Sequence, residues 1–414
     1  MMNSDVVVVG GGPAGLAAAI SASKTGARVI LVERGYRLGG ILNQCIHNGF
    51  GLHYFGTELT GPEYAARFVS ELNRTLTHVM LNTAVVNLVK TEKGFRIKTS
   101  GVNGLVDINA KAVVLAMGCR ERAGGAISLC GERPAGVFTA GFAQKMINCA
   151  GKLVGKEVAI LGSGDIGLIM ARRLVCEGAK VVGVYEVAST SSGLKRNISQ
   201  CLMDFNIPIY YNTTVTHVEG KKRVSGIRIA PVDKNWKPIE SKAKLVKCDT
   251  LLLSVGLIPE NDLVSKLPVE LSPLTNGAIT DEHGMTTLKG VFSCGNVMHV
   301  HDLVDNVSSE AERAGKNAAL LAQGKLRGGA TITVKHDEHI RYVQPVTIYK
   351  NNKTTSHLSF RVKEEYRRVA LVAYSGGKPV ARKACLVVNP GEMQELEILK
   401  TSLEDDLIIK VEGF

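Results

Sequence analysis

The sequence of 414 residues lacks a long apolar run and lacks closely spaced cysteines. A membrane-spanning helix needs about 18 or more consecutive apolar residues, so we expect no membrane span. The nearest two of its nine cysteines, Cys119 and Cys130, are 11 positions apart. This spacing excludes the CxxC and CxxxxC pairs of dithiol enzymes and the usual zinc and iron–sulfur sites. We therefore predict no metal site.

No charged segment followed by an apolar segment precedes the first expected strand, so we predict no signal peptide and a cytoplasmic location. Aromatic residues make up only 5% of the chain, and the formal net charge of +12 is not gathered into a run. Both features argue against a nucleic-acid partner. A dispersed positive charge favours anionic cofactors, anionic substrates or an acidic partner protein.

The N-terminal residues carry the motif around which the chain is organised. The apolar, β-branched run at 6–9 predicts a strand buried on both faces. Gly10, Gly12 and Gly15 follow at GxGxxG spacing. The first glycine permits a tight turn, the second lets backbone approach a pyrophosphate, and the third lets a helix pack on the strand. The Ala-rich segment 14–25 predicts that helix, with its N-terminal amides facing the phosphates.

A second strand, at 28–32, leads into Glu33, where a carboxylate would hold a ribose 2′-hydroxyl. A glycine-rich turn without a ligand is the alternative, but strand, helix, second strand and acid are all in register. The same series returns at 158–186, with GSGDIG after a strand and Glu186 after the next strand. The chain therefore holds two dinucleotide-binding folds.

Other segments complete these folds. Helices are expected at 62–76, 139–149 and 308–323, the last with Glu310 and Glu312 in its first turn. From residue 330 onward the pattern changes to alternating strands with Gly-Gly and Asn-Asn turns and no helical period, which predicts a separate all-β domain.

Three motifs together resemble a known family: GGGPAG with Glu33, GSGDIG with Glu186, and TTLKGVFSCGNV at 286–297. They are similar to the two-dinucleotide-fold flavoprotein reductases of the pyridine nucleotide-disulfide oxidoreductase superfamily, over about residues 3–325. The resemblance implies FAD on the first fingerprint and NAD(P)H on the second. It also implies that the third motif contacts the FAD ribitol and that the next helix points at the flavin.

The implied fold class is α/β, with two Rossmann-like domains of the three-layer ββα type and a C-terminal all-β domain. We expect the FAD-binding domain to comprise 1–118 and 245–328, and the NAD(P)H-binding domain to comprise 119–244. Residues 329–414 should form a C-terminal β-sandwich-like domain.

Further motifs, including GGILNQCIHNGFGL, AMGCRER, LSVGLIPEN and CGNVMHVHDLVD, resemble a narrower subgroup. That subgroup is found beside glycerol-3-phosphate dehydrogenases and is related to the FAD/NAD subunits of opine, proline and cyanide-forming dehydrogenases. The resemblance implies a second flavoprotein dehydrogenase as partner and, often, a small Cys-rich electron-transfer protein. The C-terminal domain would be the natural place for such a partner to dock.

The resemblance also implies which residues contact the two cofactors. For FAD they are Gly10, Gly12, Pro13, Ala14, Gly15, Glu33, Arg34, Gly39, Gly40, Ile41, Leu42, Val85, Ala116, Gly118, Gly295, Asn296 and Val304. For NAD(P)H they are Gly162, Gly164, Asp165, Ile166, Gly167, Glu186 and Gly256.

The chain departs from the family pattern in two places. Thioredoxin reductases carry CxxC about where this chain has residues 139–142, and the glutathione-reductase branch carries CxxxxC where this chain offers only Cys45. Dithiol exchange within the chain is therefore not expected, because it needs two thiols that can meet. The usual ribitol aspartate is replaced by Asn296, which can hydrogen-bond a hydroxyl but carries no charge.

Catalytic candidates beyond the cofactors are Cys45 and His47, as a thiolate or sulfenic acid activated by an imidazole. A packed thiol and a solvent-facing histidine are the alternative. His299, His301, Asp302 and Asp305 precede the flavin-facing helix and could move a proton or bind an acidic substrate. A metal site there would need a third ligand that the sequence does not show.

These features predict an FAD-dependent oxidoreductase that passes hydride between NAD(H) and FAD, as a subunit of a glycerol-3-phosphate or amino-acid/opine dehydrogenase. Glu186 favours NADH over NADPH because a carboxylate repels a 2′-phosphate, although Lys195 and Arg196 could bind one. The alternatives are a stand-alone NADH oxidase or peroxide reductase using Cys45, and a non-catalytic FAD-containing assembly subunit.

Overall fold

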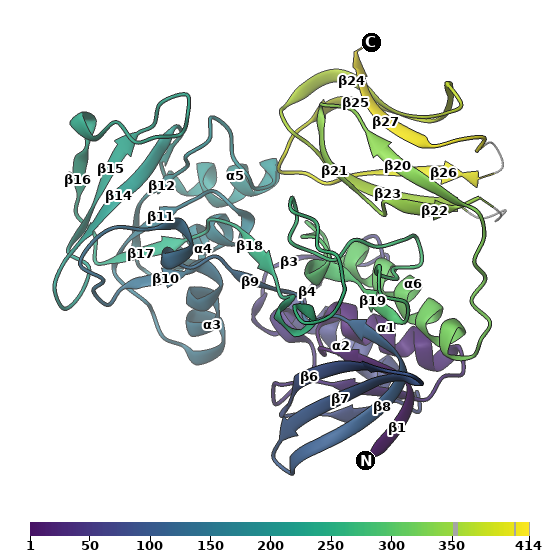
Figure 1. The fold of residues 1–414 in the computed structure, drawn as a ribbon. Helices are drawn as coiled ribbons and strands as arrows, with labels where there is room; N and C mark the ends of the chain where they lie inside the picture. The colour runs from purple at the N-terminus through teal and green to yellow at the C-terminus, as the bar shows by residue number, and fades with distance from the viewer. Residues whose placement is uncertain (351–354, 401–402, 414) are drawn as a thin grey trace. The chain divides into compact units, whose positions relative to one another are not determined.

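The computed structural model describes residues 1–350, 355–400 and 403–413. The chain divides into two compact units, Met1–Cys119 with Pro259–Phe414, and Arg120–Ile258. Figure 1 shows the elements of each unit. None of the helices in the described ranges combines the length and apolarity that crossing a bilayer requires.

The first unit is built on a seven-stranded sheet of order β5-β2-β1-β8-β7-β6, with β19 also paired to β8. Its strands are β1 (Met2–Val9), β2 (Val29–Val32), β5 (His78–Met80), β6 (Thr83–Thr91), β7 (Gly94–Gly101), β8 (Gly104–Leu115) and β19 (Val291–Ser293). The pairs β1–β2, β1–β8, β2–β5 and β8–β19 are parallel. Val9 lies opposite both Val32 and Leu115, and Leu115 lies opposite Ser293. These strands therefore end along one edge of the sheet.

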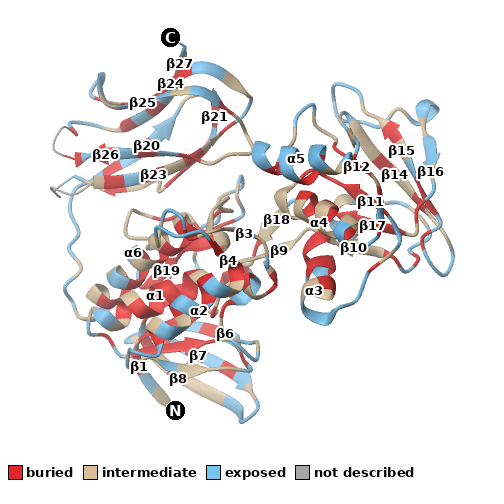
Figure 2. Cartoon of the chain, turned by 180° about the vertical axis from the view of Figure 1, so that it is seen from behind, coloured by how far each residue is buried: buried red, intermediate tan, exposed pale blue. Residues whose placement is uncertain are grey.

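Three helices cover one face of this sheet: α1 (Pro13–Lys24), α2 (Gly61–Leu72) and α6 (Val304–Ala322). α1 and α6 pack closely because small residues line their contact. A Cβ on Gly315 would lie only 2.1 Å from the carbonyl oxygen of Ala18. Figure 2 shows α1 as a largely buried element. Short strands β3 (Asn48–Phe50) and β4 (Leu59–Thr60) precede α2, whose N-terminus is closed by a capping box of Thr60 and Glu63.

The start of α6 differs from the sequence prediction. We expected the helix to begin near 308, but it begins at Val304, so its first turn carries Asp305, and Glu310 lies in the second turn. The reason is tertiary. The Asp305 carboxylate accepts the backbone amides of Gly51 and His53, both at 2.8 Å, which fixes the first turn against a loop that is distant in sequence.

The second unit contains a parallel five-stranded sheet of order β10-β17-β11-β12-β13. Its strands are β10 (Val137–Thr139), β11 (Glu157–Leu161), β12 (Lys180–Tyr185), β13 (Ile209–Tyr210) and β17 (Thr250–Leu253). Its helices are α3 (Ala140–Ala150), α4 (Asp165–Cys176) and α5 (Lys195–Cys201). An antiparallel sheet of β14 (Thr213–Glu219), β15 (Gly226–Pro231) and β16 (Lys244–Val246) completes it. Two more short strands are β9 (Cys119–Glu121) and β18 (Leu257–Pro259).

One predicted boundary is wrong. We assigned residues 245–258 to the FAD-binding domain, but they lie in the second unit. The apolar strand β17 pairs in parallel with both β10 and β11, so it is a central strand of the second sheet.

The C-terminal residues form the predicted all-β part with its own core. One sheet has the order β22-β20-β27-β24-β25, and the other has the order β21-β23-β26. The strands are β20 (Thr331–His336), β21 (Ile340–Gln344), β22 (Thr347–Tyr349), β23 (Thr355–Val362), β24 (Tyr366–Ser375), β25 (Lys378–Val388), β26 (Gln394–Leu399) and β27 (Leu407–Gly413). Side chains from both sheets, such as Phe360 and Leu371, share one core. The predicted fold class, two Rossmann-like domains with a β-rich C-terminal part, is confirmed.

Candidate cofactor sites

The carboxyl edge of the first sheet gathers the residues that follow four parallel strands. Gly10 follows β1, Glu33 follows β2, Ala116 follows β8, and Gly295 follows β19 by one residue. Ligands of open α/β sheets bind at this edge, where neighbouring strands connect in opposite directions. β1 lies between β2 and β8, so the first fingerprint stands at such a switch point.

The glycines of the first fingerprint are required by close contacts. Gly10 has a φ of +103°, and a Cβ there would lie 2.5 Å from the carbonyl oxygen of Ala116. A Cβ on Gly15 would lie 1.7 Å from the carbonyl oxygen of Gly10. The first glycine therefore permits the turn, and the third lets α1 pack against β1.

The first turn of α1, which follows Gly12, suits a phosphate group. The nearest atom to a Cβ on Gly12 would be the Cα of Gly40, at 3.9 Å, so two bare backbone segments face each other there. Gly12 caps α1 without a side-chain hydrogen bond, and the first turn of α1 carries no acidic residue. The N-terminal amides of α1 are thus left without side-chain acceptors, which suits an anion such as the pyrophosphate of FAD.

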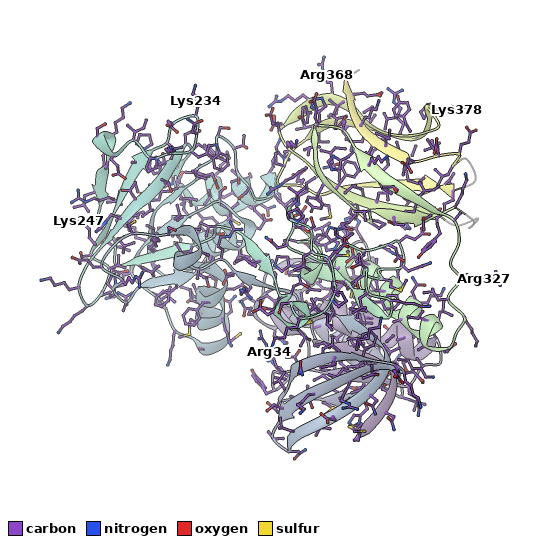
Figure 3. All side chains as sticks on the ribbon, viewed as in Figure 1. Arg34, Lys234, Lys247, Arg327, Arg368 and Lys378 are labelled. Carbon is purple, nitrogen blue, oxygen red and sulfur yellow. The ribbon has the colours of Figure 1, made fainter. Side chains whose placement is uncertain are left out.

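Glu33 is held by the two turns around it. One carboxylate oxygen accepts the Gly11 amide at 2.6 Å, and the other accepts the Gly35 amide at 2.6 Å. An ionised carboxylate has about four acceptor positions, so Glu33 keeps capacity for hydroxyl groups. Arg34, the next residue, is exposed, and Figure 3 labels its side chain.

The other predicted FAD residues occupy varied positions. Pro13 and Ala14 open α1, and Gly39 precedes the 3-10 turn Gly40–Gln44, in which Ile41 is exposed and Leu42 is buried. Gly118 has a φ of +71°, and no other atom would lie within 4 Å of a Cβ on it. Val304 is the first residue of α6. Val85 lies on β6 and packs with the core on the sheet face opposite α1.

The third motif forms a turn fixed by polar contacts. The amide of Gly295 donates to Oε1 of Glu310 at 2.6 Å. Oδ1 of Asn296 accepts the amide of His301 at 3.0 Å, and Nδ2 of Asn296 lies 3.7 Å from Sγ of Cys119. Cys119 was not among the predicted site residues, because nothing in the sequence places it beside a turn 177 positions away.

Glu310 joins two buried histidines to this turn. Its Oε2 lies 2.9 Å from Nε2 of His299, and its Oε1 lies 3.3 Å from Nε2 of His301. Burial would raise the pKa of Glu310, but the neighbouring imidazoles of His301 and His299 outweigh it, so the pKa is lowered. Burial lowers the pKa of His299, and the carboxylate only partly opposes this effect. Glu310 was not among the predicted site residues, because the expected helix start near 308 placed it in the first turn as a helix-capping charge.

Glu310 also supplies the third metal-ligand position that the sequence does not show. The ligand atoms of His299, His301 and Glu310 lie within 4.8 Å of one another. Metal-bound imidazoles nearly always donate their second N–H to a partner. Neither histidine Nδ1 has a partner among the described residues, whereas Glu310 already accepts the Gly295 amide. The geometry favours a cluster in which Glu310 contacts the Gly295 amide and the two imidazoles, rather than a metal centre.

Asp302 and Asp305 serve structural contacts. Asp305 accepts backbone amides of the 51–54 loop, as described above. Asp302 forms an ion pair with Arg361 and accepts the amide of Met393. These contacts leave the proton-transfer role we considered for the two carboxylates without support.

Cys45 and His47 lie in the loop after the Gly40–Gln44 turn. Sγ of Cys45 donates to the carbonyl oxygen of Ile41 at 3.3 Å. Nδ1 of His47 lies 3.0 Å from the carbonyl oxygen of Asn48, and its ring packs 5.0 Å from that of Phe50. None of the nine cysteines forms a disulfide within the described ranges. A catalytic role for this pair stays a prediction.

The second fingerprint repeats the first. Gly162 has a φ of +88°, and a Cβ there would lie 2.2 Å from the carbonyl oxygen of Ser254. Gly164 caps α4 without a side-chain hydrogen bond. A Cβ on Gly167 would lie 2.5 Å from Cβ of Ser254, which follows β17.

Glu186 occupies the position that Glu33 has in the first unit. Its Oε2 accepts both the amide, at 2.9 Å, and the hydroxyl of Ser163, and its Oε1 accepts the Ala188 amide at 2.9 Å. Glu186 is only 5% exposed.

Charged residues occupy the first turns of α4 and α5, next to the second fingerprint. Oδ1 of Asp165 accepts the amide of Leu194 at 2.8 Å and the side-chain amide of Asn197 at 2.6 Å. Lys195 and Arg196 stand at the start of α5. Of the other predicted contacts, Ile166 is partly buried in α4, and Gly256 has a φ of +100°.

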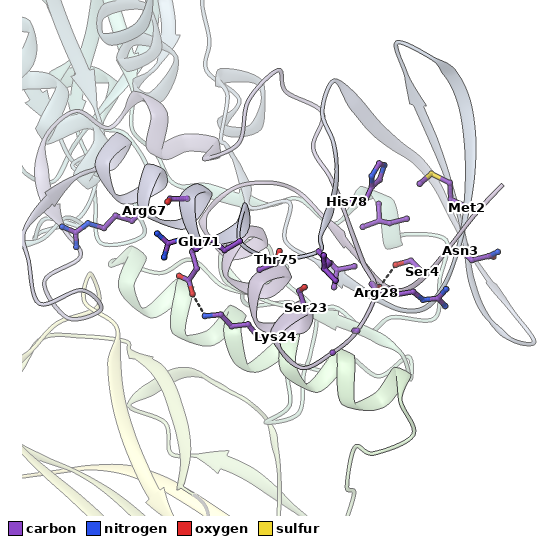
Figure 4. Close-up of a pocket in the computed structure, with 17 residues that line it drawn as sticks. Met2, Asn3, Ser4, Ser23, Lys24, Arg28, Arg67, Glu71, Thr75 and His78 are labelled. Carbon is purple, nitrogen blue, oxygen red and sulfur yellow. Dashed lines mark hydrogen bonds and ion pairs between the residues drawn. The ribbon is translucent and has the colours of Figure 1, made fainter.

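A groove of about 990 Å³ lies at the other edge of the first sheet (Figure 4). It is lined by the start of β1, the end of α1 and the segment before β2, including Asn3, Lys24 and Arg28. Since β1 starts there and ends at Val9, just before the fingerprint, this groove is not the cofactor site.

Comparisons with known proteins agree with this arrangement. Residues 4–318 match the sequence profile of the pyridine nucleotide-disulphide oxidoreductases. Hydrogen cyanide synthase subunit HcnB of Pseudomonas protegens is 28% identical over 287 residues, covering 65% of this chain and 60% of that protein. A component of the alkyl hydroperoxide reductase of Staphylococcus aureus is 29% identical over 324 residues, covering 77% of this chain and 58% of that protein. The chain thus spans about three fifths of the length of these two relatives.

A thioredoxin reductase of T. acidophilum shares the fold, with a TM-score of 0.65 and 24% sequence identity over 79% of this chain and 100% of that chain. FAD and a pyridine nucleotide are typical cofactors of such proteins, and the two fingerprint sites fit them. The profile match covers more than half of the chain, and the fold agrees with it. The chain is therefore an enzyme of the pyridine nucleotide-disulphide oxidoreductase family.

Proposed function

We propose that this protein passes hydride between NAD(H) and FAD, with FAD on the first fingerprint and NAD(H) on the second. The observation that carries the proposal is the repeated geometry of the two sites. In each, the amide after the first fingerprint glycine donates to the glutamate that follows the second strand, Gly11 to Glu33 and Ser163 to Glu186. That pairing holds the turn and the acid in the relation that a dinucleotide requires.

In this proposal the chain binds and orients the cofactors, and FAD supplies the hydride chemistry when it is bound. The N-terminal amides of α1 hold the FAD pyrophosphate, and Glu33 accepts ribose hydroxyls. Asn296 hydrogen-bonds the ribitol, while Glu310 keeps the Gly295 amide in place.

We also propose that NADH is preferred over NADPH. Glu186 is nearly buried and accepts two backbone amides and a hydroxyl. A 2′-phosphate would bring further negative charge against this carboxylate, whereas a 2′-hydroxyl can donate to it. Lys195 and Arg196 are the residues that would reduce this preference.

The electrons are proposed to be exchanged with a partner dehydrogenase that acts on glycerol 3-phosphate or on an amino acid or opine. None of the nine cysteines is spaced for a CxxC or CxxxxC pair, and none forms a disulfide within the described ranges. The relative from Pseudomonas protegens is named as a subunit of a cyanide synthase. A small Cys-rich protein belongs to the same proposal as an electron carrier.

Steady-state NADH oxidation by the purified chain tests this proposal. We expect turnover with an artificial dye and at least about tenfold slower turnover with oxygen or a quinone, because the natural acceptor is a protein. Rapid turnover of the isolated chain with oxygen or a quinone would contradict the assignment to a multi-subunit enzyme.

A further inference from the structure

The C-terminal β-domain forms hydrogen bonds and an ion pair with the loop at 300–302, which leads into α6. Arg361, on β23, donates to the carbonyl oxygen of Val300 at 3.1 Å and forms an ion pair with Oδ1 of Asp302. The amide of Met393 donates to Oδ2 of the same carboxylate at 2.6 Å. Both oxygens of Asp302 are therefore held by the C-terminal domain.

This contact is enclosed. The side chains of Arg361 and Asp302 are 13% and 15% exposed. Burial alone would lower the pKa of Arg361, but Asp302 and Tyr342 outweigh it and the pKa is raised. Removing one partner would leave a buried charge without compensation, which is far more costly than losing a surface pair.

The same loop is held on its other side by the proposed FAD turn. The amide of His301, the residue before Asp302, donates to Oδ1 of Asn296 at 3.0 Å. His299 contacts Glu310, which in turn accepts the Gly295 amide. A displacement of Asp302 must therefore move His301 and the Asn296 side chain that it holds.

We propose that Arg361 is a positioning residue for FAD, and that the C-terminal domain is part of the scaffold of the cofactor site. The inference rests on the proposed function, which places FAD on the first fingerprint. Arg361 need not contact the flavin, because it acts through Val300 and Asp302 on the turn at Gly295 and on the start of α6 at Val304. This role differs from that of a docking module joined only by a linker.

A second set of contacts, between the C-terminal β-domain and residues 281–282, provides an internal control. We call this set the second joint. Nζ of Lys400 lies 2.6 Å from Oε1 of Glu282, and both side chains are less than a tenth exposed. The hydroxyl of Tyr349 donates to Asp281 at 2.7 Å. This joint involves residues 281–282 and none of the residues from Gly295 to Val304, so its loss should loosen the domain without acting on the FAD turn directly.

The test uses the full-length protein and four variants: Arg361→Leu, Arg361→Lys, Arg367→Leu, and the double variant Glu282→Gln with Lys400→Met. Arg367 is the matched control, since its side chain is 74% exposed and pairs with Glu365, two positions before it in sequence. The readouts are the FAD dissociation constant, measured by flavin fluorescence after removal of the cofactor, and the flavin reduction potential.

We expect Arg361→Leu to raise the FAD dissociation constant by at least about tenfold and to shift the potential, since the loop loses its buried charge partner. Arg361→Lys should recover part of the affinity, because it keeps the charge but loses the planar fork. Arg367→Leu and the double variant should stay within about twofold of wild type in FAD affinity, because surface pairs and distant sites act independently.

Arg361→Leu with wild-type affinity and potential would overturn the inference, as would a double variant that loses as much FAD affinity as Arg361→Leu. If Arg361→Leu does not fold, Arg361→Lys decides, and wild-type values for it overturn the inference. A wild-type chain that binds no FAD would overturn the proposed function and this inference with it. A flavin-loaded wild type with an unaffected Arg361→Leu variant would overturn the inference alone.

Discussion

The two fingerprint sites, residues 10–15 with Glu33 and residues 162–167 with Glu186, are called here the first and the second cradle. They have the same arrangement but differ in how much hydrogen-bonding capacity they leave open. In the first cradle, Glu33 accepts two backbone amides and stays partly exposed, and α1 begins with Pro13. In the second, Glu186 also accepts a serine hydroxyl and is 5% exposed, and α4 begins with Asp165.

This difference has a physical consequence for binding. A ligand gains little by replacing hydrogen bonds that the protein already makes, since only the surplus over existing contacts and ordering costs appears as affinity. The second cradle satisfies more of its own polar groups than the first. We therefore predict a tightly held cofactor in the first unit and an exchangeable one in the second.

The largest expected effect comes from the third glycine of each fingerprint. Gly15→Ala would place a Cβ 1.7 Å from a backbone carbonyl oxygen, whereas Gly167→Ala would meet the side chain of Ser254 at 2.5 Å. We expect Gly15→Ala to cost more than about 3 kcal/mol in unfolding free energy and Gly167→Ala about 1–2 kcal/mol, because the closer overlap at Gly15 forces the larger backbone shift. Denaturant titration and flavin content after purification measure both. Equal losses would mean that the two helix–strand contacts tolerate a methyl group alike.

The second effect concerns the two glutamates. Glu33→Gln should raise the FAD dissociation constant by about 10- to 100-fold, because a charge-assisted acceptor is worth roughly 1.5–3 kcal/mol. Glu186→Gln should change NADH affinity less and should lower the NADH-to-NADPH ratio of kcat/KM by about tenfold, since it removes the repulsion of a 2′-phosphate. A Glu186→Gln variant with the wild-type ratio would remove the basis for the nicotinamide preference.

Glu310 gives the first cradle a pH dependence. Its pKa is lowered from 4.5, so its contribution to stability is complete above that pH and is lost as the pH falls through the lower, folded-state value. Above about pH 5, we expect the free energy of unfolding of wild type to exceed that of Glu310→Gln by about 2 kcal/mol, which is typical of a hydrogen bond to a charged group. The difference should shrink at lower pH in denaturant titrations. A constant difference would show that the carboxylate charge is not what holds the Gly295 turn.

A smaller effect is expected where the second cradle is made to resemble the first. Ser163→Gly removes the hydroxyl that donates to Glu186 and leaves the backbone amide in place. We expect NADH to bind up to about threefold more tightly, since one acceptor position becomes open to the ribose. Calorimetric titration with NADH measures this change. Weaker binding would mean that the hydroxyl positions Glu186 for the ligand.

No effect on hydride transfer is expected from Cys45→Ser. The thiol donates to the Ile41 carbonyl, a contact that a hydroxyl can replace. NADH-to-dye turnover should remain within about twofold of wild type, because flavin reduction by nicotinamide needs no thiol. A large loss of turnover would support the peroxide-reductase alternative.

Much of both cradles could be predicted from the sequence, because their determinants are local. The turns at Gly10 and Gly162 follow strands directly, and Glu33 and Glu186 follow the next strands, so spacing alone brings each set to one edge of a sheet. The pairing of strands that are distant in sequence could not be predicted in the same way. The apolar strand β17 fits either unit by composition, and only its parallel pairing with β10 and β11 assigns it.

The surroundings of the third motif could not be predicted from local patterns. The start of α6 depends on amides near Gly51, and the partners of Gly295 and Asp302 are Glu310 and Arg361. No spacing rule relates these positions, because tertiary packing alone brings them together. Asn296 could be recognised by its motif. The position of Cys119 beside it could not be predicted, because the two residues are 177 positions apart in sequence.

Hydride exchange between FAD in the first unit and NAD(H) in the second is the step on which the proposed function depends. Anaerobic rapid mixing of the flavin-loaded protein with NADH, followed by the visible absorbance of the flavin, observes that step itself. We expect the oxidised flavin band to bleach within a single turnover, and to bleach more slowly with NADPH. A flavin that stays oxidised although NADH binds would contradict the proposal.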